Sequence, residues 1–181
     1  MSTVELTDVK TLRQRARQHV EQGAVTEGYN ADREQILRLL NESLATEWVC
    51  ALRYKRHYFM ASGIKASGIK ASVAAEEFLE HATQELEHAD KLAERIVQLG
   101  GEPDLNPDNL SKHSHAQYVE GKNLEEMVLE DLVAERIAID SYREIIQYIG
   151  ESDPTTRRIF EEILAQEEEH ADDMADLLKG L

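Results

Sequence analysis

The sequence predicts an all-α protein: a four-helix bundle over residues 32–181, preceded by an N-terminal extension over residues 1–31. Four long segments of helical character are each bounded by residues typical of helix ends. Aromatic residues make up only 6% of the chain and prolines number three, which favours long helices over sheets. One connection between the segments is long and the other two are short. Matched helices joined in this way are typical of a bundle.

The extension and the first two helices are delimited by breakers and caps. Residues 1–31 hold one short amphipathic segment followed by glycines. The first bundle helix is predicted from Asp32, whose carboxylate can cap it, to about Ala61. The second is predicted over about residues 72–99, because Gly100-Gly101 follows it.

The third and fourth helices have clearer starts. Asn123 is a capping residue with a glutamate three positions later, and this helix is predicted to end near Gly150. Asp153-Pro154 is a cap followed by proline at the first helical position, and the last helix is predicted to end near Gly180. Each helix is then roughly 40–45 Å long at 1.5 Å per residue.

The connections predict the order of the helices in space. Residues 62–71 repeat the unit SGIKA, and residues 151–153 are shorter still, so each is expected to join an antiparallel pair. Residues 101–122 can span roughly 70 Å when extended. That reach exceeds one helix length, so this segment is predicted to cross over and leave the second and third helices parallel.

Composition excludes several classes of protein. The formal net charge of −16 repels phosphate backbones and attracts cations, which disfavours nucleic-acid binding by the whole molecule. Cys50 is the single cysteine, so no disulfide framework exists within the chain. The first ten residues lack the apolar core of a signal peptide, and no run approaches the length of a membrane span. We therefore expect a soluble cytoplasmic protein.

A nearly identical heptapeptide occurs in the second and fourth helices, QELEHAD at residues 84–90 and QEEEHAD at residues 166–172. Residues i and i+3 lie on one face of a helix, so Glu85 can point to the same place as His88, and Glu167 to the same place as His170. One such pair would most often be a surface feature of a Glu-rich helix. Two copies that also agree in their flanking residues, both at mid-helix, indicate a shared site.

The first and third helices carry a second matching pair. Glu47 is followed seven residues later by Tyr54, and Glu135 is followed seven residues later by Tyr142. Seven residues make two helical turns, so each tyrosine is expected on the face of its glutamate. Both glutamates are near mid-helix. All four carboxylates are therefore predicted at one height in the bundle, where the tyrosines could orient them by hydrogen bonds.

Buried carboxylates need a compensating cation, because an unpaired one is very costly in a low dielectric. One alternative is an ion-pair network in which Arg53 or Arg136 supplies the positive charge. Both arginines are adjacent in sequence to candidate residues, however, and this places them on different faces of their helices. Four inward glutamates and two inward histidines instead match the ligand set of a dinuclear iron or manganese site. His57, His113 and His115 are expected to lie outside that centre, and Cys50 to be a small core residue.

The region from Asp32 to Lys179 resembles the ferritin-like family, and within it bacterioferritins most closely. The resemblance implies that Glu85 and Glu167 bridge two irons, that one iron is also bound by Glu47 and His88 and the other by Glu135 and His170, and that Tyr54 lies beside the site. By this resemblance, six residues match the family's ferroxidase ligands: Glu47, Glu85, His88, Glu135, Glu167 and His170.

Other features depart from bacterioferritins. Leu86 stands where they have the haem-ligating methionine, so no haem is predicted. The chain stops at Leu181 without the short fifth helix of ferritins, and it carries an N-terminal extension. These two features are similar to Dps-type proteins. The expected assembly is a homo-oligomeric cage of twelve subunits, with 24 as the alternative.

The resemblance implies iron storage and detoxification: Fe(II) is oxidised by O₂ or H₂O₂ at the dinuclear site, and Fe(III) mineral is stored inside the cage. Glu76, Glu77 and Glu80 are candidates for pore or mineral-nucleating residues. Two alternatives remain open. One is a DNA-protecting protein that binds through basic residues of the extension, although residues 1–21 carry a net charge of only 4 − 3 = +1. The other is a di-manganese enzyme similar to catalase, or an oxygenase.

Overall fold

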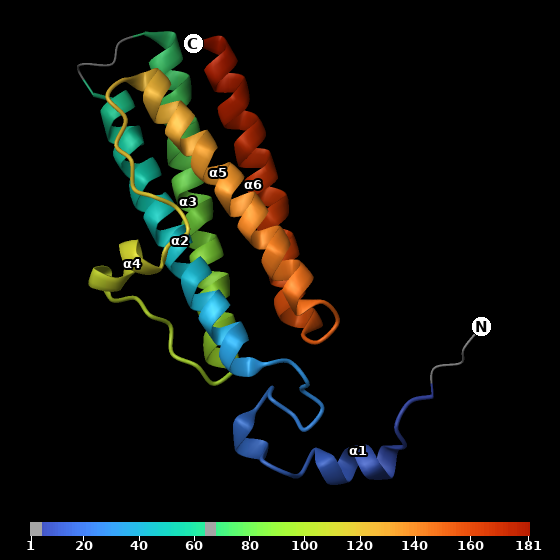
Figure 1. Ribbon diagram of the computed structural model, residues 1–181. Coiled ribbons are helices and arrows are strands. Elements are labelled where there is room, and N and C mark those ends of the chain that lie inside the picture. Colours follow the sequence, from blue (N-terminus) through green and yellow to red (C-terminus); the bar gives the residue numbers. More distant parts are fainter. Residues whose placement is uncertain (1–4, 64–67) are drawn as a thin grey trace.

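The computed structural model describes residues 5–63 and 68–181, and all regular secondary structure in these ranges is helical. Helices α2, α3, α5 and α6 form a bundle (Figure 1). The elements are α1 (Val9–Arg15), the 3₁₀ turn η1 (Val20–Gln22), α2 (Arg33–Ala61), α3 (Ile69–Gln98), α4 (Pro107–His113), α5 (Leu124–Ile149) and α6 (Pro154–Gly180). The all-α fold class is confirmed. No helix of the described ranges is both long and apolar enough to span a membrane.

Side-chain caps start three of the four long helices where the sequence predicted them. The carboxylate of Asp32 accepts the backbone N–H of Gln35 at 3.1 Å. Asn123 and Asp153 accept equivalent bonds at 2.8 and 2.9 Å at the starts of α5 and α6. Such caps satisfy backbone N–H groups that have no partner within the helix.

The start of α3 differs from the prediction. This helix begins at Ile69, three residues before the expected Ser72, and its N-cap is Gly68, which has no capping side chain. Because no polar cap marks the start, the sequence carried no signal for it. Of the repeated SGIKA segment before it, residues 64–67 lie outside the described residues.

The end of α3 depends on two glycines, as the sequence predicted. Gly100 has a φ of +76°, a conformation that favours glycine. The N–H of Gly101 donates to the carbonyl of Ile96 at 2.9 Å, which closes the last turn. A Cβ at Gly101 would lie 2.6 Å from a methyl carbon of Leu37, so the Leu37 side chain would have to move to admit a larger residue.

Two antiparallel helix pairs make up the bundle. We call α2 with α3 the first hairpin and α5 with α6 the second hairpin; within each, the two helices pack extensively. The crossover between them runs along α2, so that α3 and α5 are parallel as predicted (Figure 1). The crossover also contains α4, which packs on α2 and was not predicted.

Most of the core belongs to two larger apolar clusters, and two smaller clusters include residues of the crossover. The cluster near the start of α2 includes Leu40, Leu92, Tyr142, Phe160 and Ile163. The cluster near the opposite end of the bundle includes Tyr54, Phe78, Val128 and Met174. The two clusters leave a middle layer of the bundle, and that layer holds the polar residues described below.

In the described part of the N-terminal extension, the residues that pack against the bundle core lie in its second half. Helix α1 has no buried residue and lies apart from the four long helices (Figure 1). In contrast, Val25, Tyr29 and Ala31 pack against the first apolar cluster. The hydroxyl of Tyr29 also donates to Asp153 at 2.8 Å, which ties the extension to the start of α6.

Candidate metal centre

The six acidic and histidine residues singled out in the sequence lie together in the middle layer of the bundle. Each is at most 2% exposed. All four long helices contribute: Glu47 from α2, Glu85 and His88 from α3, Glu135 from α5, and Glu167 and His170 from α6. The matched mid-helix positions therefore converge, as predicted.

These residues form two groups that could each hold a metal ion. One group is Glu47, Glu85, His88 and Glu167; the other is Glu85, Glu135, Glu167 and His170. Within each group, one donor atom from every residue lies within 4.8 Å of the others. Glu85 and Glu167 belong to both groups.

The shared glutamates present one oxygen to each histidine. His88 Nδ1 lies 3.7 Å from Glu85 Oε2 and 3.1 Å from Glu167 Oε1. His170 Nδ1 lies 3.4 Å from Glu85 Oε1 and 3.5 Å from Glu167 Oε2. Both carboxylates thus extend across the centre from one histidine to the other.

The remaining two glutamates each face a single histidine. Glu47 Oε2 lies 3.2 Å from His88 Nδ1, and Glu135 Oε2 lies 4.0 Å from His170 Nδ1. The arrangement has approximate twofold symmetry, with one half-site on each side of the shared carboxylates. The duplicated heptapeptide is therefore the sequence counterpart of this symmetry.

Several atoms of the centre have no hydrogen-bond partner in the described structure. They are Glu85 Oε1, Glu135 Oε2, both carboxylate oxygens of Glu167, and His170 Nδ1. Buried polar atoms are rarely left without a partner. Carboxylate oxygens and imidazole nitrogens facing one small space suit iron, manganese or zinc. The residues present therefore fit a dinuclear metal site.

Burial and mutual repulsion also shift the protonation of these groups. Burial, with repulsion from Glu85, raises the pKa of Glu47 to about 8. Burial, with repulsion from Glu167, raises the pKa of Glu135 well above its ordinary value. Burial alone would lower the pKa of His170, but the carboxylates of Glu167 and Glu85 outweigh it and raise that pKa to about 9. Without a metal, bound protons offset part of the negative charge.

Two glutamines orient the histidines. His88 Nε2 donates to Gln166 Oε1 at 2.8 Å, and His170 Nε2 donates to Gln84 Oε1 at 2.8 Å. An amide oxygen only accepts, so Nε2 carries a hydrogen and Nδ1 faces the centre. Both glutamines belong to the repeated heptapeptide. Their recurrence was visible in the sequence, but this cross-hairpin role was not predicted.

The tyrosines reach across the bundle. Tyr54 donates its hydroxyl hydrogen to Glu135, and Tyr142 donates to Glu47. Each tyrosine was expected on the face of the glutamate in its own helix, and it does point to the centre. Its hydrogen-bond partner, however, is the glutamate of the other hairpin, because the facing helix brings that carboxylate closer.

The alternative of an arginine partner for these glutamates is wrong. Arg53 is buried, but its Nε donates to Asp131 Oδ1 at 2.7 Å, and Asp131 Oδ2 lies 2.7 Å from His57 Nδ1. Arg136 is exposed. Neither guanidinium compensates the centre.

The other residues discussed from the sequence lie outside the centre. His113 and His115 lie near Asp104 and Glu42, both at 3.7 Å. Cys50 is a buried free thiol. Leu86 is 38% exposed.

One histidine beside the centre was not predicted. His81 is 1% exposed, and its ring stacks on that of His170 with a centroid distance of 4.0 Å. It lies four residues before Glu85, so the helical spacing placed it on a neighbouring face. Glu77, four residues earlier on the same helix, was visible from the spacing, but Asp173 and His170 come from α6 and share no fixed spacing with His81.

Comparisons with known proteins agree with this geometry. The ferritin-like domain family matches residues 37–181. Bacterioferritin of Mycobacterium avium is 31% identical over 139 residues, or 76% of this chain and 80% of the relative. The bacterioferritin of Brucella melitensis is 31% identical over 141 residues, with coverage of 76% and 79%.

Solved structures show the same relationship. The bacterioferritin-related dodecameric thioferritin of Bacteroides fragilis superposes with a TM-score of 0.75 at 30% identity, covering 82% of this chain and 87% of that chain. Dps from Thermosynechococcus elongatus, at 21% identity, has a TM-score of 0.74 and coverage of 80% and 90%, which shows a likeness of fold alone. Because the family match extends over most of the chain, the protein belongs to the ferritin-like family.

Proposed function

We propose that the protein is a ferroxidase that oxidises Fe(II) and stores the resulting Fe(III). The observation that carries this proposal is the pair of half-sites that share Glu85 and Glu167. In the proposed site these two carboxylates bridge two Fe(II) ions. Glu47 and His88 complete the binding of one ion, and Glu135 and His170 complete the other. Membership of the ferritin-like family supports iron as the substrate.

The paired site suits a two-electron oxidation. Each Fe(II) gives up one electron. With H₂O₂ as acceptor, two electrons and two protons yield two water molecules; with O₂, they yield H₂O₂. Two metal ions held by shared carboxylates supply both electrons together, so no one-electron oxygen radical is released. Manganese in the same residues is the alternative, with peroxide chemistry similar to that of a catalase.

The proposed assembly is a hollow homo-oligomer of twelve subunits, with 24 as the alternative. The Bacteroides fragilis relative, described as dodecameric, supports the smaller number. The net charge of −16 favours attraction of Fe(II) to the assembly. We propose no haem, because Leu86 offers no ligand atom.

Anaerobic Fe(II) titration of metal-free protein, followed by mixing with O₂ or H₂O₂, tests this function. We expect saturation near two Fe(II) per chain and rapid oxidation. Glu85→Ala and His170→Ala should abolish both. Glu87→Ala and Glu169→Ala are matched controls, because both residues are exposed on the same helices. Oxidation that is indifferent to the first pair would exclude this centre, and Mn(II) binding in preference to Fe(II) would favour the catalase-like alternative.

A further inference from the structure

His81 is a buried histidine whose polar atoms are not explained by hydrogen bonding. Its Nε2 lies 3.4 Å from Asp173 Oδ2 on α6 and 3.9 Å from Glu77 Oε2 on its own helix. Both distances exceed those of a good hydrogen bond. Its Nδ1 has no partner among the described residues. A histidine that is 1% exposed would ordinarily have its nitrogens satisfied.

The two carboxylates beside His81 are open to solvent. The side chain of Glu77 is 34% exposed and that of Asp173 is 46% exposed. On its inner side, His81 stacks on His170 of the metal centre. The three residues therefore lie between the surface and the centre.

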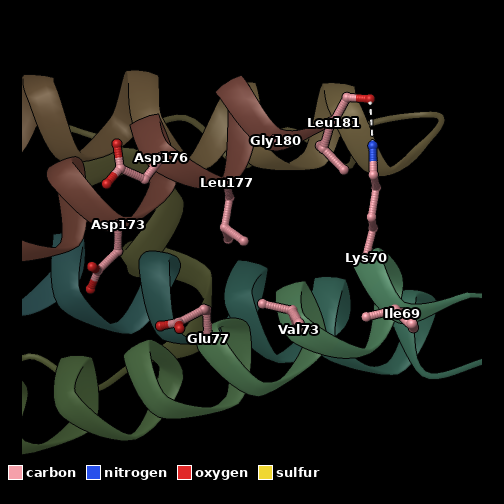
Figure 2. A pocket seen from close by; sticks show the side chains of 9 residues that line it. All are labelled: Ile69, Lys70, Val73, Glu77, Asp173, Asp176, Leu177, Gly180 and Leu181. Atoms are coloured by element: carbon pink, nitrogen blue, oxygen red, sulfur yellow. Dashed lines mark hydrogen bonds between the residues drawn. The ribbon is translucent and has the colours of Figure 1, made fainter.

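A cavity of about 360 Å³ between α3 and α6 reaches this place. Glu77 and Asp173 come from facing helices at one end of it, and Asp176 adds a third carboxylate (Figure 2). The apolar side chains of Val73 and Leu177 form its middle. Its acidic end is thus adjacent to His81.

We propose that His81 Nε2, Glu77 and Asp173 form a third divalent-cation site that holds Fe(II) on its way from this cavity to the dinuclear centre. One donor atom from each residue lies within 4.8 Å of the other two. Ligand atoms on one ion lie about 3 to 3.5 Å apart when metal–ligand bonds are near 2.1 Å. Glu77 would have to move closer for all three residues to bind one ion, and its side chain is 34% exposed.

The donor set suits the same ions as the centre. One imidazole nitrogen and two carboxylate oxygens bind Fe(II), Mn(II) or Zn(II), and the remaining positions can be taken by water. The staging role rests on the proposed ferroxidase function, whereas cation binding at these residues does not. The two parts therefore need separate readouts.

Crystals of the intact assembly soaked anaerobically in Co(II) test the binding. We expect three anomalous-difference peaks per chain, two at the dinuclear centre and one among Glu77, His81 and Asp173. The double variant Glu77→Gln/Asp173→Asn should lose the third peak and keep the other two. It leaves His81 in place and is nearly isosteric, so the fold is retained. Glu94→Gln/Glu162→Gln changes the same charge at exposed positions of α3 and α6 that do not line the cavity, and it is the matched control.

The outcomes separate the two proposals. Peaks at the centre alone in the unchanged protein would overturn the third site and leave the ferroxidase proposal standing. A third peak without peaks at the centre would support this site and overturn the dinuclear function. A third peak that persists in the double variant would overturn the ligand assignment.

Oxidation kinetics test the staging role. At Fe(II) concentrations below saturation, we expect the initial oxidation rate of the double variant to fall several-fold relative to the control variant. The number of Fe(II) ions bound at the centre should remain two per chain. An unchanged rate in a variant that has lost the third peak would overturn the staging role.

Discussion

At the scale of single residues, the histidines of the centre depend on partners from the opposite hairpin. Gln166 of α6 accepts the Nε2 hydrogen of His88 on α3, and Gln84 of α3 does the same for His170 on α6. A metal-binding histidine whose second nitrogen is held in this way keeps one tautomer and one ring orientation. The glutamines therefore contribute to metal binding without contacting the metal.

Gln166→Leu should weaken metal binding roughly 10- to 100-fold, because His88 loses the acceptor that fixes its tautomer. Gln166→Glu restores an acceptor and should recover much of the affinity. Anaerobic Co(II) titration, followed by visible absorption, measures this. Gln147→Leu, at an exposed position of α5, is the control. Equal affinities for Gln166→Leu and the control would show that the glutamine does not orient the ligand.

Metal binding should release protons and strengthen as the pH rises. Glu47 has a pKa of about 8 and His170 a pKa of about 9 in the metal-free protein, both above their ordinary values of 4.5 and 6.5. A metal must displace these protons. Calorimetric titration at pH 7 in buffers of different ionisation enthalpy should therefore show net proton release; none would contradict the shifts.

The raised pKa values of Glu47 and His170 also determine how the stability of the metal-free protein changes with pH. Between pH 4.5 and about 8, folded metal-free protein holds a proton on Glu47 that the unfolded chain has released. This contribution to stability is complete below pH 4.5 and is lost as the pH rises through 8. The raised pKa of His170 acts in the same direction, between 6.5 and about 9.

At the scale of elements, a buried ionic network joins α2, α5 and the crossover. Arg53 of α2 and His57 one turn later both contact Asp131 of α5. Arg53 also donates to the carbonyl of Gln117 at 3.1 Å, and His57 Nε2 lies 3.0 Å from the carbonyl of Glu120. The network therefore holds the second half of the crossover against the helices that carry Glu47 and Glu135.

Asp131→Ala should lower the free energy of unfolding by about 3–5 kcal/mol, because it leaves the buried Arg53 guanidinium without its anion. Urea denaturation of the metal-free protein measures this loss. Asp140→Ala removes an exposed partner of Arg143, 3.6 Å away, and should cost at most about 1 kcal/mol. A similar, small loss in both variants would mean that Arg53 finds another partner or water.

Much of this architecture follows from local signals. Asp32, Asn123 and Asp153 cap helices where their spacing predicted, and the i, i+3 pairs predicted which faces meet. Two helix starts were not predicted, each for a local reason. The uncapped start of α3 at Gly68 has no polar marker. Asn106 and Pro107 do carry a cap-and-proline signal for α4, but in a short polar segment it was not interpreted as a helix.

The candidate site, too, could be predicted only in part. Spacing within a helix predicted that the six acidic and histidine residues face one another, because each pair needs only one helix to be aligned. The partners of Gln84, Gln166 and the two tyrosines depend on how the hairpins face each other. His81 could not be assigned, since its neighbours Asp173 and His170 come from α6 and share no fixed spacing with it.

At the scale of the whole molecule, the first part of the extension differs from the bundle in burial and in charge. Helix α1 has no buried residue, and the basic side chains on and beside it are exposed: Lys10, Arg13, Arg15 and Arg17. A net charge of −16 opposes binding to a polyanion. Many copies of the extension on one assembly could still add avidity.

Deleting residues 1–22 should leave Fe(II) oxidation unchanged, because the metal centre draws all its residues from α2, α3, α5 and α6. We expect the full chain to show no DNA binding at physiological salt in a fluorescence-anisotropy titration. Binding by the full chain that disappears in the deletion variant would instead favour the DNA-protecting alternative. Binding that persists after the deletion would exclude the extension as its cause.

The centre lies at the interface between the two hairpins, and hydrogen bonds cross that interface. Tyr54, Tyr142, Gln84 and Gln166 each bond to a residue of the opposite hairpin, and the shared carboxylates contact both histidines. In metal-free protein this interface contains carboxylates that repel one another and polar atoms without partners. Local separation of the two hairpins should therefore begin there. A ligand that binds only the closed form stabilises it by mass action. Bound iron would then hold the two hairpins together. Slower hydrogen exchange of the backbone amides in the facing turns of all four helices would show this effect.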